Sequence, residues 1–255
     1  MEGTAAASAG RRAESFGSGA SAADRLARTN PGLAVLGPGD PRLARYGRIA
    51  ELPGLAALAQ AAAPRIPSNL EANAYTASDP ELEAHPAAAA FGPVFGFQPL
   101  QVGWNAGPNT RLNGLEWHAS PEVLVAVTDL ALLLGRVEDI DWDSPGGPAY
   151  PSDLVECLFL PAGSALEIFP GTMHLAPCRL SDRGFKSLVV LPRGTNEILS
   201  EEEKAAAAKR AAAGDLRARL LFMRNKWILA HPERKVLVDK GAWPGITGPN
   251  VEVRY

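Results

Sequence analysis

Two glutamates and a histidine stand close together near the middle of this chain, in a pattern that could hold a metal ion. Glu116 and His118 are two positions apart in the segment 112–118, and Glu122 follows four positions later. Alternate residues of a strand face the same side, so Glu116 and His118 share one face. The break at 119–121 then allows a returning strand to bring Glu122 to the same point. This arrangement is typical of metal ligation.

A second segment supplies a closing ligand. His174 follows the turn at Pro170-Gly171, which itself follows an expected strand at 165–169. Imidazole nitrogens combined with carboxylate oxygens suit Mn, Zn, Fe, Co or Ni better than Ca or a thiolate-bound structural zinc. We therefore expect one divalent transition metal, held by the set Glu116, His118, Glu122 and His174.

Alternatively, His118 could be a hydrogen-bonded histidine of the core, beside Trp117. Against it, Glu116 and Glu122 lie next to His118 in the sequence. Two carboxylates are costly to bury unless a cation or hydrogen-bond donors compensate them. The metal interpretation is therefore preferred.

Three further charged residues interrupt apolar strands and are candidate acids or bases: Glu167, Glu156 and Lys186. Each would be a solvated side chain if it lay on the outer face of the sheet, and for Lys186 the outward direction is favoured. Glu167 is the preferred proton carrier because its short strand leads across a turn to His174, so both side chains could face one cavity. Asp129, in the most apolar run, is expected to have a structural partner.

Short stretches rich in β-branched, aromatic and leucine residues fill the region from 91 to 195, separated by Gly, Pro, Asn or Asp. Such spacing favours an all-β sandwich or barrel over alternating strands and helices. The expected strands are 99–104, 112–118, 123–134, 153–160, 165–169, 172–178 and 184–191.

The flanking regions differ in composition. Residues 1–25 are mainly Ala, Gly and Ser and predict a disordered arm. Residues 26–90 predict an N-terminal extension with one short helix at 55–63. Residues 196–255 predict C-terminal helices and a tail, with Ser200 as the N-cap of the first helix. A second helix is expected over about 215–229, because Leu216, Leu220, Leu221 and Trp227 would share one face.

Composition excludes several functional classes. The net charge of −3 gives no global basic field to attract nucleic acid. No apolar run reaches the ~18 residues of a membrane helix, and the N-terminus lacks a secretory pattern. Two cysteines cannot build a disulfide framework. A cytoplasmic protein that acts on a small-molecule substrate, without nucleic-acid or membrane partners, is the expectation.

The spacing of the candidate ligands resembles the two motifs of the cupin family. Glu116-x-His118-x-x-x-Glu122 is similar to the first motif, with Glu116 in place of its first histidine, and Gly163 followed by Pro170-Gly171-x-x-His174 is similar to the second. The wider sequence from about 95 to 235 resembles a bacterial family of cupin-like proteins known only as a domain of unknown function. Runs that carry this likeness include 112–118, 125–135, 174–178, 190–196 and 225–233.

The resemblance implies a double-stranded β-helix, the cupin or jelly-roll barrel, at 91–195, and a homodimer. It also implies a metal-dependent enzyme, with cupin sugar isomerases such as D-lyxose isomerase and the ketodeoxyuronate isomerase as the nearest comparison. The expected function is an isomerase or epimerase of a small sugar or sugar acid. A ureidoglycolate-type lyase and a non-catalytic sugar-binding cupin are the alternatives, because fold does not determine function.

Overall fold

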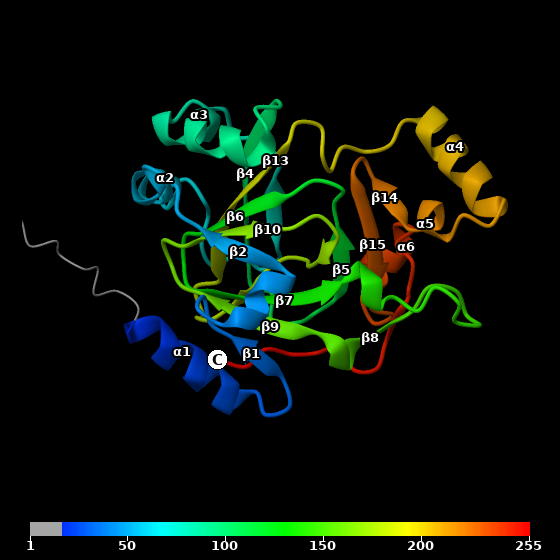
Figure 1. Ribbon diagram of the computed structural model, residues 1–255, viewed down its shortest axis with the longest axis horizontal. Helices are drawn as coiled ribbons and strands as arrows, with labels where there is room; N and C mark the ends of the chain where they lie inside the picture. The colour runs from blue at the N-terminus through cyan, green and yellow to red at the C-terminus, as the bar shows by residue number, and fades with distance from the viewer. Residues whose placement is uncertain (1–16) are drawn as a thin grey trace, which may run out of the picture.

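The structure is a computed structural model and describes residues 17–255. Two antiparallel sheets face each other in its centre, and helices lie outside them (Figure 1). Within the first sheet the order is β4-β13-β6-β10, and the second contains β5, the segment 172–179, β7 and β9. The strands are β4 (Leu100–Gly107), β5 (Gly114–Trp117), β6 (Glu122–Ala126), β7 (Leu130–Arg136), β9 (Glu156–Leu160), β10 (Ala165–Ile168), β11 (Thr172–Met173), β12 (Cys178–Arg179) and β13 (Phe185–Pro192).

This arrangement is that of a jelly roll, because the chain passes repeatedly between the two sheets: β4, β6, β10 and β13 lie in the first, and β5, β7, β9 and β11 in the second. β11 and β12 both pair with β7, and the backbone groups of Glu116 and His174 exchange hydrogen bonds of 2.6 and 2.9 Å that join β5 to this segment. The predicted all-β double-stranded β-helix is therefore confirmed. The run expected as one strand at 123–134 is the pair β6 and β7, with a turn in which Asp129 accepts a hydrogen bond from the Ala162 amide at 2.8 Å.

The space between the two sheets is filled largely by leucine. Leu124 of β6, Leu132 of β7, Leu158 of β9 and Leu166 of β10 are each at most 2% exposed and belong to one cluster. Side chains of alternate residues point outward, where two further clusters cover the outer faces of the sheets. Burial on both faces explains why these strands read as nearly continuous apolar runs.

The N-terminal extension adds strands to both sheets and helices to the outside. β1 (Ala34–Leu36) pairs with β9, β2 (Gly47–Ala50) with β10, and β3 (Ala74–Thr76) with β4. The other elements are η1 (Pro41–Arg45), α2 (Leu55–Ala62), α3 (Pro80–Glu83) and η2 (Pro86–Phe95). In Figure 1, α2 and α3 lie on the same side of the molecule, beside β4 and β13.

The predicted disordered arm spans 1–25, of which 1–16 lie outside the described residues. Residues 17–25 belong to α1 (Gly17–Thr29), so for them the prediction was wrong. The reason is tertiary packing. Ala23 and Leu26 are buried at 8% and 4% exposure against the outer face of the second sheet, and this contact offsets the poor intrinsic propensity of the segment.

The C-terminal region is only partly helical. α4 (Glu201–Ala212) starts at the predicted N-cap Ser200, which forms a capping box with Glu203. The predicted helix at 215–229 was wrong: α5 (Leu216–Arg219) is one short helix, and a hairpin follows. The hairpin consists of β14 (Leu221–Met223) and β15 (Lys226–Ala230), and β15 pairs with β5.

The hairpin forms because Asn225 adopts a left-handed backbone with φ 54°, which turns the chain, and because Trp227 packs on Trp117 across the β5–β15 pair. The remaining elements are η3 (Val137–Asp139), β8 (Tyr150–Pro151), η4 (Ser152–Leu154), α6 (Lys235–Asp239) and β16 (Ile246–Thr247). None of the helices in residues 17–255 combines the length and hydropathy that crossing a bilayer requires.

Candidate metal centre

Strands β5 and β6 and the segment 172–179 bring the four predicted ligands together in the space between the sheets. In β5, Leu115 and Trp117 face the outer cluster, so Glu116 and the following His118 face inward, as the alternation of the sequence predicts. Glu122 begins β6, and the backbone of His174 is bonded to that of Glu116. All four side chains are buried: Glu116 is 8% exposed, His118 3%, Glu122 4% and His174 3%.

The side-chain atoms of these residues converge. The Oε2 atom of Glu122 lies 3.4 Å from Nε2 of His118 and 3.2 Å from Nε2 of His174. On the other side, Oε1 of Glu116 lies 3.9 Å from Nε2 of His118. Ligand atoms of Glu116, His118 and His174 all lie within 4.8 Å of one another. Glu122 thus contacts both imidazoles, and Glu116 faces that of His118.

Backbone carbonyls fix the orientation of both imidazoles. Nδ1 of His118 is 2.6 Å from the carbonyl of Asn225, and Nδ1 of His174 is 3.2 Å from that of Thr172. A carbonyl only accepts, so each Nδ1 carries the proton and donates. In a neutral imidazole, Nε2 then keeps its lone pair, which points into the site.

Lone pairs and carboxylate oxygens that face one another at 3.2–3.9 Å repel unless a cation lies between them. Nε2 of His118 is buried without a hydrogen bond to any residue that the structure describes. A divalent transition metal fits this donor set, because ligands at about 2.0–2.2 Å from an ion lie about 3–3.5 Å apart. Glu116, His118 and His174 therefore form a possible divalent-metal site of nitrogen and oxygen donors, and Glu122 contacts both imidazoles.

Without a metal, a proton on an imidazole reduces the repulsion between these atoms. Burial raises the pKa of Glu122, but the charge of His174 and the interactions with both imidazoles, His118 and His174, outweigh burial and hold that pKa well below its usual range. Burial in turn lowers the pKa of His174, and Glu122 outweighs it and keeps the pKa above the usual value. A proton on the imidazole and a metal would thus compete for the same position.

Lys226 is a residue of this site that the sequence interpretation missed. Its ammonium contacts the carboxylate of Glu116, and both side chains are largely buried. Lys226 begins β15, next to Asn225, whose carbonyl fixes His118. A polar turn between two apolar runs, at 224–226, was the signal in the sequence that could have indicated a hairpin here.

A cavity of about 260 Å³ opens beside the ligands. Glu116, Glu122 and His174 form one part of its wall, and apolar and polar side chains from other segments form the rest. Tyr75 and Asn196 lie there, and the side-chain amide of Asn196 donates to the hydroxyl of Tyr75 at 3.0 Å. The remaining polar side chains of the wall are Asn73, Asn105 and Lys226.

The three predicted proton carriers lie elsewhere, which corrects the sequence interpretation. Glu167 is opposite Val123 in the β6–β10 pair, so it faces away from Glu122, and it forms an ion pair with Arg48 at 2.8 Å. Lys186 also points outward, where its ammonium donates to the carbonyl of Ala63 at the end of α2.

Glu156 is held at the edge of the barrel by Tyr46, whose hydroxyl donates to it at 2.6 Å, and by Arg42 and Arg45. The period of a strand fixes which residues share a face, but pairing decides which face is inward. The cysteines are buried thiols, and burial raises the pKa of Cys157 to about 12.

Comparison with known proteins identifies a family. The family described as "Domain of unknown function (DUF4867)" matches residues 39–251. No curated protein matches the chain.

Solved structures similar to the chain include a point mutant of oxalate decarboxylase from Bacillus subtilis, with 11% identity and a TM-score of 0.31, covering 59% of this chain and 34% of that one. Oxalate decarboxylase from Lactobacillus farciminis with formate has 17% identity and a TM-score of 0.30, covering 58% and 37%. The capsular polysaccharide assembling protein CapF from Staphylococcus aureus has 17% identity and a TM-score of 0.28, covering 41% and 25%. The alignments span about a quarter to just over a third of these proteins.

Proposed function

The chain belongs to the family of DUF4867 domains, and because that description names no reaction, we propose a function from the site itself: a metal-dependent isomerase or epimerase of a small sugar or sugar acid. The reaction would move a proton at a carbon next to a carbonyl group. One observation carries the proposal. Two buried imidazoles, each oriented by a backbone carbonyl, direct Nε2 at a buried carboxylate beside a cavity with both polar and apolar walls.

The donor set limits the choice of metal, and the metal in turn determines what chemistry the site can perform. Imidazole nitrogen and carboxylate oxygen suit Mn, Zn, Fe, Co or Ni. Such an ion, when bound, polarises a carbonyl oxygen and makes the adjacent C–H more acidic. We assign His118, Glu122 and His174 as its protein ligands, since Glu122 contacts both imidazoles at 3.4 and 3.2 Å. Three protein ligands leave positions open for a substrate.

The cavity suits a small hydroxylated molecule. Its volume of about 260 Å³ is below the ~300–1,000 Å³ typical of pockets for drug-sized ligands, which fits a monosaccharide. Asparagine amides and the hydroxyl of Tyr75 offer donors and acceptors for hydroxyl groups. Leu124 and Val189 supply an apolar wall for the C–H face of such a molecule.

We assign the proton transfer to Glu116, a role that the sequence interpretation gave to Glu167. One carboxylate oxygen of Glu116 faces the metal ligands, and the other contacts the ammonium of Lys226. Glu116 can take a proton from substrate carbon and return it to the neighbouring carbon, while Lys226 balances the charge of the carboxylate. Glu116 and Glu122 thus have different roles: one is the base and the other a ligand.

The test uses protein loaded with each of the five metals in turn. NMR measures the incorporation of deuterium from the solvent into pentoses, hexoses and hexuronates. We expect incorporation with at least one sugar. Glu116→Gln should lose incorporation and keep the metal, whereas Glu122→Gln should lose both. Loss of metal in Glu116→Gln would make Glu116 a ligand. Absence of incorporation with every sugar in metal-loaded protein would contradict the isomerase proposal.

A further inference from the structure

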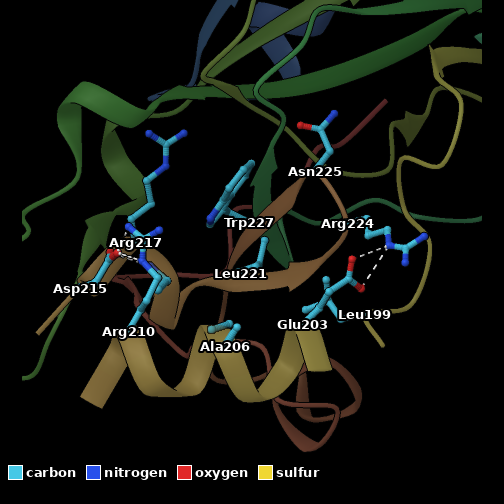
Figure 2. A pocket seen from close by; sticks show the side chains of 12 residues that line it. Leu199, Glu203, Ala206, Arg210, Asp215, Arg217, Leu221, Arg224, Asn225 and Trp227 are labelled. Carbon is cyan, nitrogen blue, oxygen red and sulfur yellow. Dashed lines mark hydrogen bonds and ion pairs between the residues drawn. The ribbon is translucent and has the colours of Figure 1, made fainter. Parts of the chain in front are cut away.

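A second pocket, separate from the metal cavity, lies between α4 and the β14–β15 hairpin. Its volume is about 590 Å³, within the range of ~300–1,000 Å³ typical of small-molecule sites. Figure 2 shows α4 along one side, with Ala206 and Glu203 directed at the hairpin, and Leu221 and Trp227 opposite. None of its residues takes part in the proposed reaction.

The centre of the pocket is apolar. Leu221 and Trp227 come from the hairpin, Leu199 precedes α4, and Ala206 and Ala207 are the small residues that α4 presents to them. No residue of α4 is buried, although the helix is 12 residues long. Small side chains on a helix that stands off from a sheet leave room for an apolar body between the two.

Arginines lie around this apolar centre, and one of them has no anionic partner. Arg210 pairs with Asp215 at 2.6 Å, and Arg224 pairs with Glu203 at 3.0 Å and with Glu197 at 2.6 Å. The guanidinium of Arg217, by contrast, forms neither an ion pair nor a hydrogen bond with any residue in 17–255. Its guanidinium lies 4.9 Å from the centre of the Trp227 ring.

That contact with Trp227 fixes the position of the Arg217 guanidinium at the wall of the pocket. Trp227 is itself held by stacking on Trp117, with ring centroids 6.1 Å apart. A guanidinium positioned by a rigid ring loses little conformational freedom when it binds an anion, and it can bind a carboxylate through two parallel hydrogen bonds. Together, the apolar centre and the free guanidinium specify the chemistry of a ligand.

We propose that this pocket binds a small organic anion, a carboxylate on a flat apolar body, with the carboxylate on Arg217 and the body between Leu221 and Ala206. The ligand is distinct from the sugar of the metal cavity. The proposal does not depend on the metal, because none of the residues that line this pocket is among the candidate metal ligands.

The experiment is calorimetric titration of the full chain with 2-naphthoate, in both the metal-loaded and the EDTA-treated protein. We expect one site per chain under both conditions. Binding to Arg217→Met, which keeps the apolar stem and removes the charge, should be at least tenfold weaker. The matched control is Arg219→Met. Arg219 belongs to the same helix and lies 3.7 Å from the ring centre of Trp243, but it does not line the pocket. Its loss should leave the affinity unchanged.

A neutral analogue, 2-naphthalenemethanol, should bind at least tenfold more weakly than the acid. Equal weakening in the two arginine variants, or unchanged affinity in Arg217→Met, would overturn the proposal. So would binding that disappears with EDTA, which would place the probe in the metal cavity. The proposal would also be overturned if 2-naphthoate did not bind and the chain formed a dimer that Arg217→Met disrupts. That result would assign this face to a second copy of the chain.

Discussion

The jelly-roll barrel and the β14–β15 hairpin contribute differently to the same site. The barrel, through β5, β6 and the segment 172–179, provides the four side chains that could hold a metal. The hairpin provides no metal ligand, but the carbonyl of Asn225 orients His118 and the ammonium of Lys226 contacts Glu116. The barrel thus determines which atoms converge, and the hairpin determines the orientation and charge of two of them.

The largest difference between the two regions should appear when a barrel ligand is removed. His174→Ala removes one of the converging nitrogens and should abolish stoichiometric metal binding while the barrel stays folded. The control is His231→Ala. His231 is also buried, but its Nε2 is 3.1 Å from the carbonyl of Gly248, away from the site. Metal content after loading and circular dichroism check both variants, and equal metal loss in both would remove the special role of His174.

Changing the charge that the hairpin supplies should affect turnover more than metal content. Lys226→Met leaves the carboxylate of Glu116 without its cation and should slow proton exchange about 100-fold, with the metal retained. Lys186→Met removes an outward lysine that caps α2 at Ala63, and exchange should be unchanged. The measurements are the rates of proton exchange from NMR and the melting temperatures of both variants. Comparable slowing by the two changes would show a general loss of stability instead.

A smaller effect is expected when the turn loses its side chain and keeps its backbone. Asn225→Gly tolerates the positive φ and preserves the carbonyl on His118, but it removes hydrogen bonds to Ser120 and Thr195 of 2.9 and 3.1 Å. We expect metal affinity to fall about tenfold. Asn113→Gly is the matched control for Asn225→Gly, since the backbone of Asn113 also has a positive φ. The hairpin would have no orienting role if titration with the metal gave equal affinities for Asn225→Gly and the wild type.

The smallest change is expected from Glu167→Gln, which tests the corrected interpretation. Arg48, the partner of Glu167, has a side chain that is 66% exposed, so the pair contributes no more than about 1 kcal/mol to the free energy of unfolding. Proton exchange should be unaffected, because Glu167 faces away from Glu122. A loss of exchange, measured beside Glu116→Gln, would return Glu167 to the role of base.

The barrel and the grouping of its polar residues could be predicted because local patterns specify them. Alternation in 112–118 places Glu116 and His118 on one face, and both are buried inside the barrel. The direction of Glu167 could not be predicted, since it depends on pairing with a distant strand. The hairpin was mistaken for a helix because the leucine spacing fits both periods over a short run, and the partner that decides, β5, lies about 110 residues away in the chain.

The most direct test of the account is the metal content and ligand environment of the full chain after loading with Mn, Zn, Fe, Co or Ni. Elemental analysis should give one ion per chain, and X-ray absorption spectroscopy should show two imidazole nitrogens, with oxygen completing the coordination and sulfur absent. The two cysteines are buried apart from the site, and neither is among the residues that converge there. No bound ion with any of the five metals, or a coordination shell without two imidazoles, would contradict the metal centre.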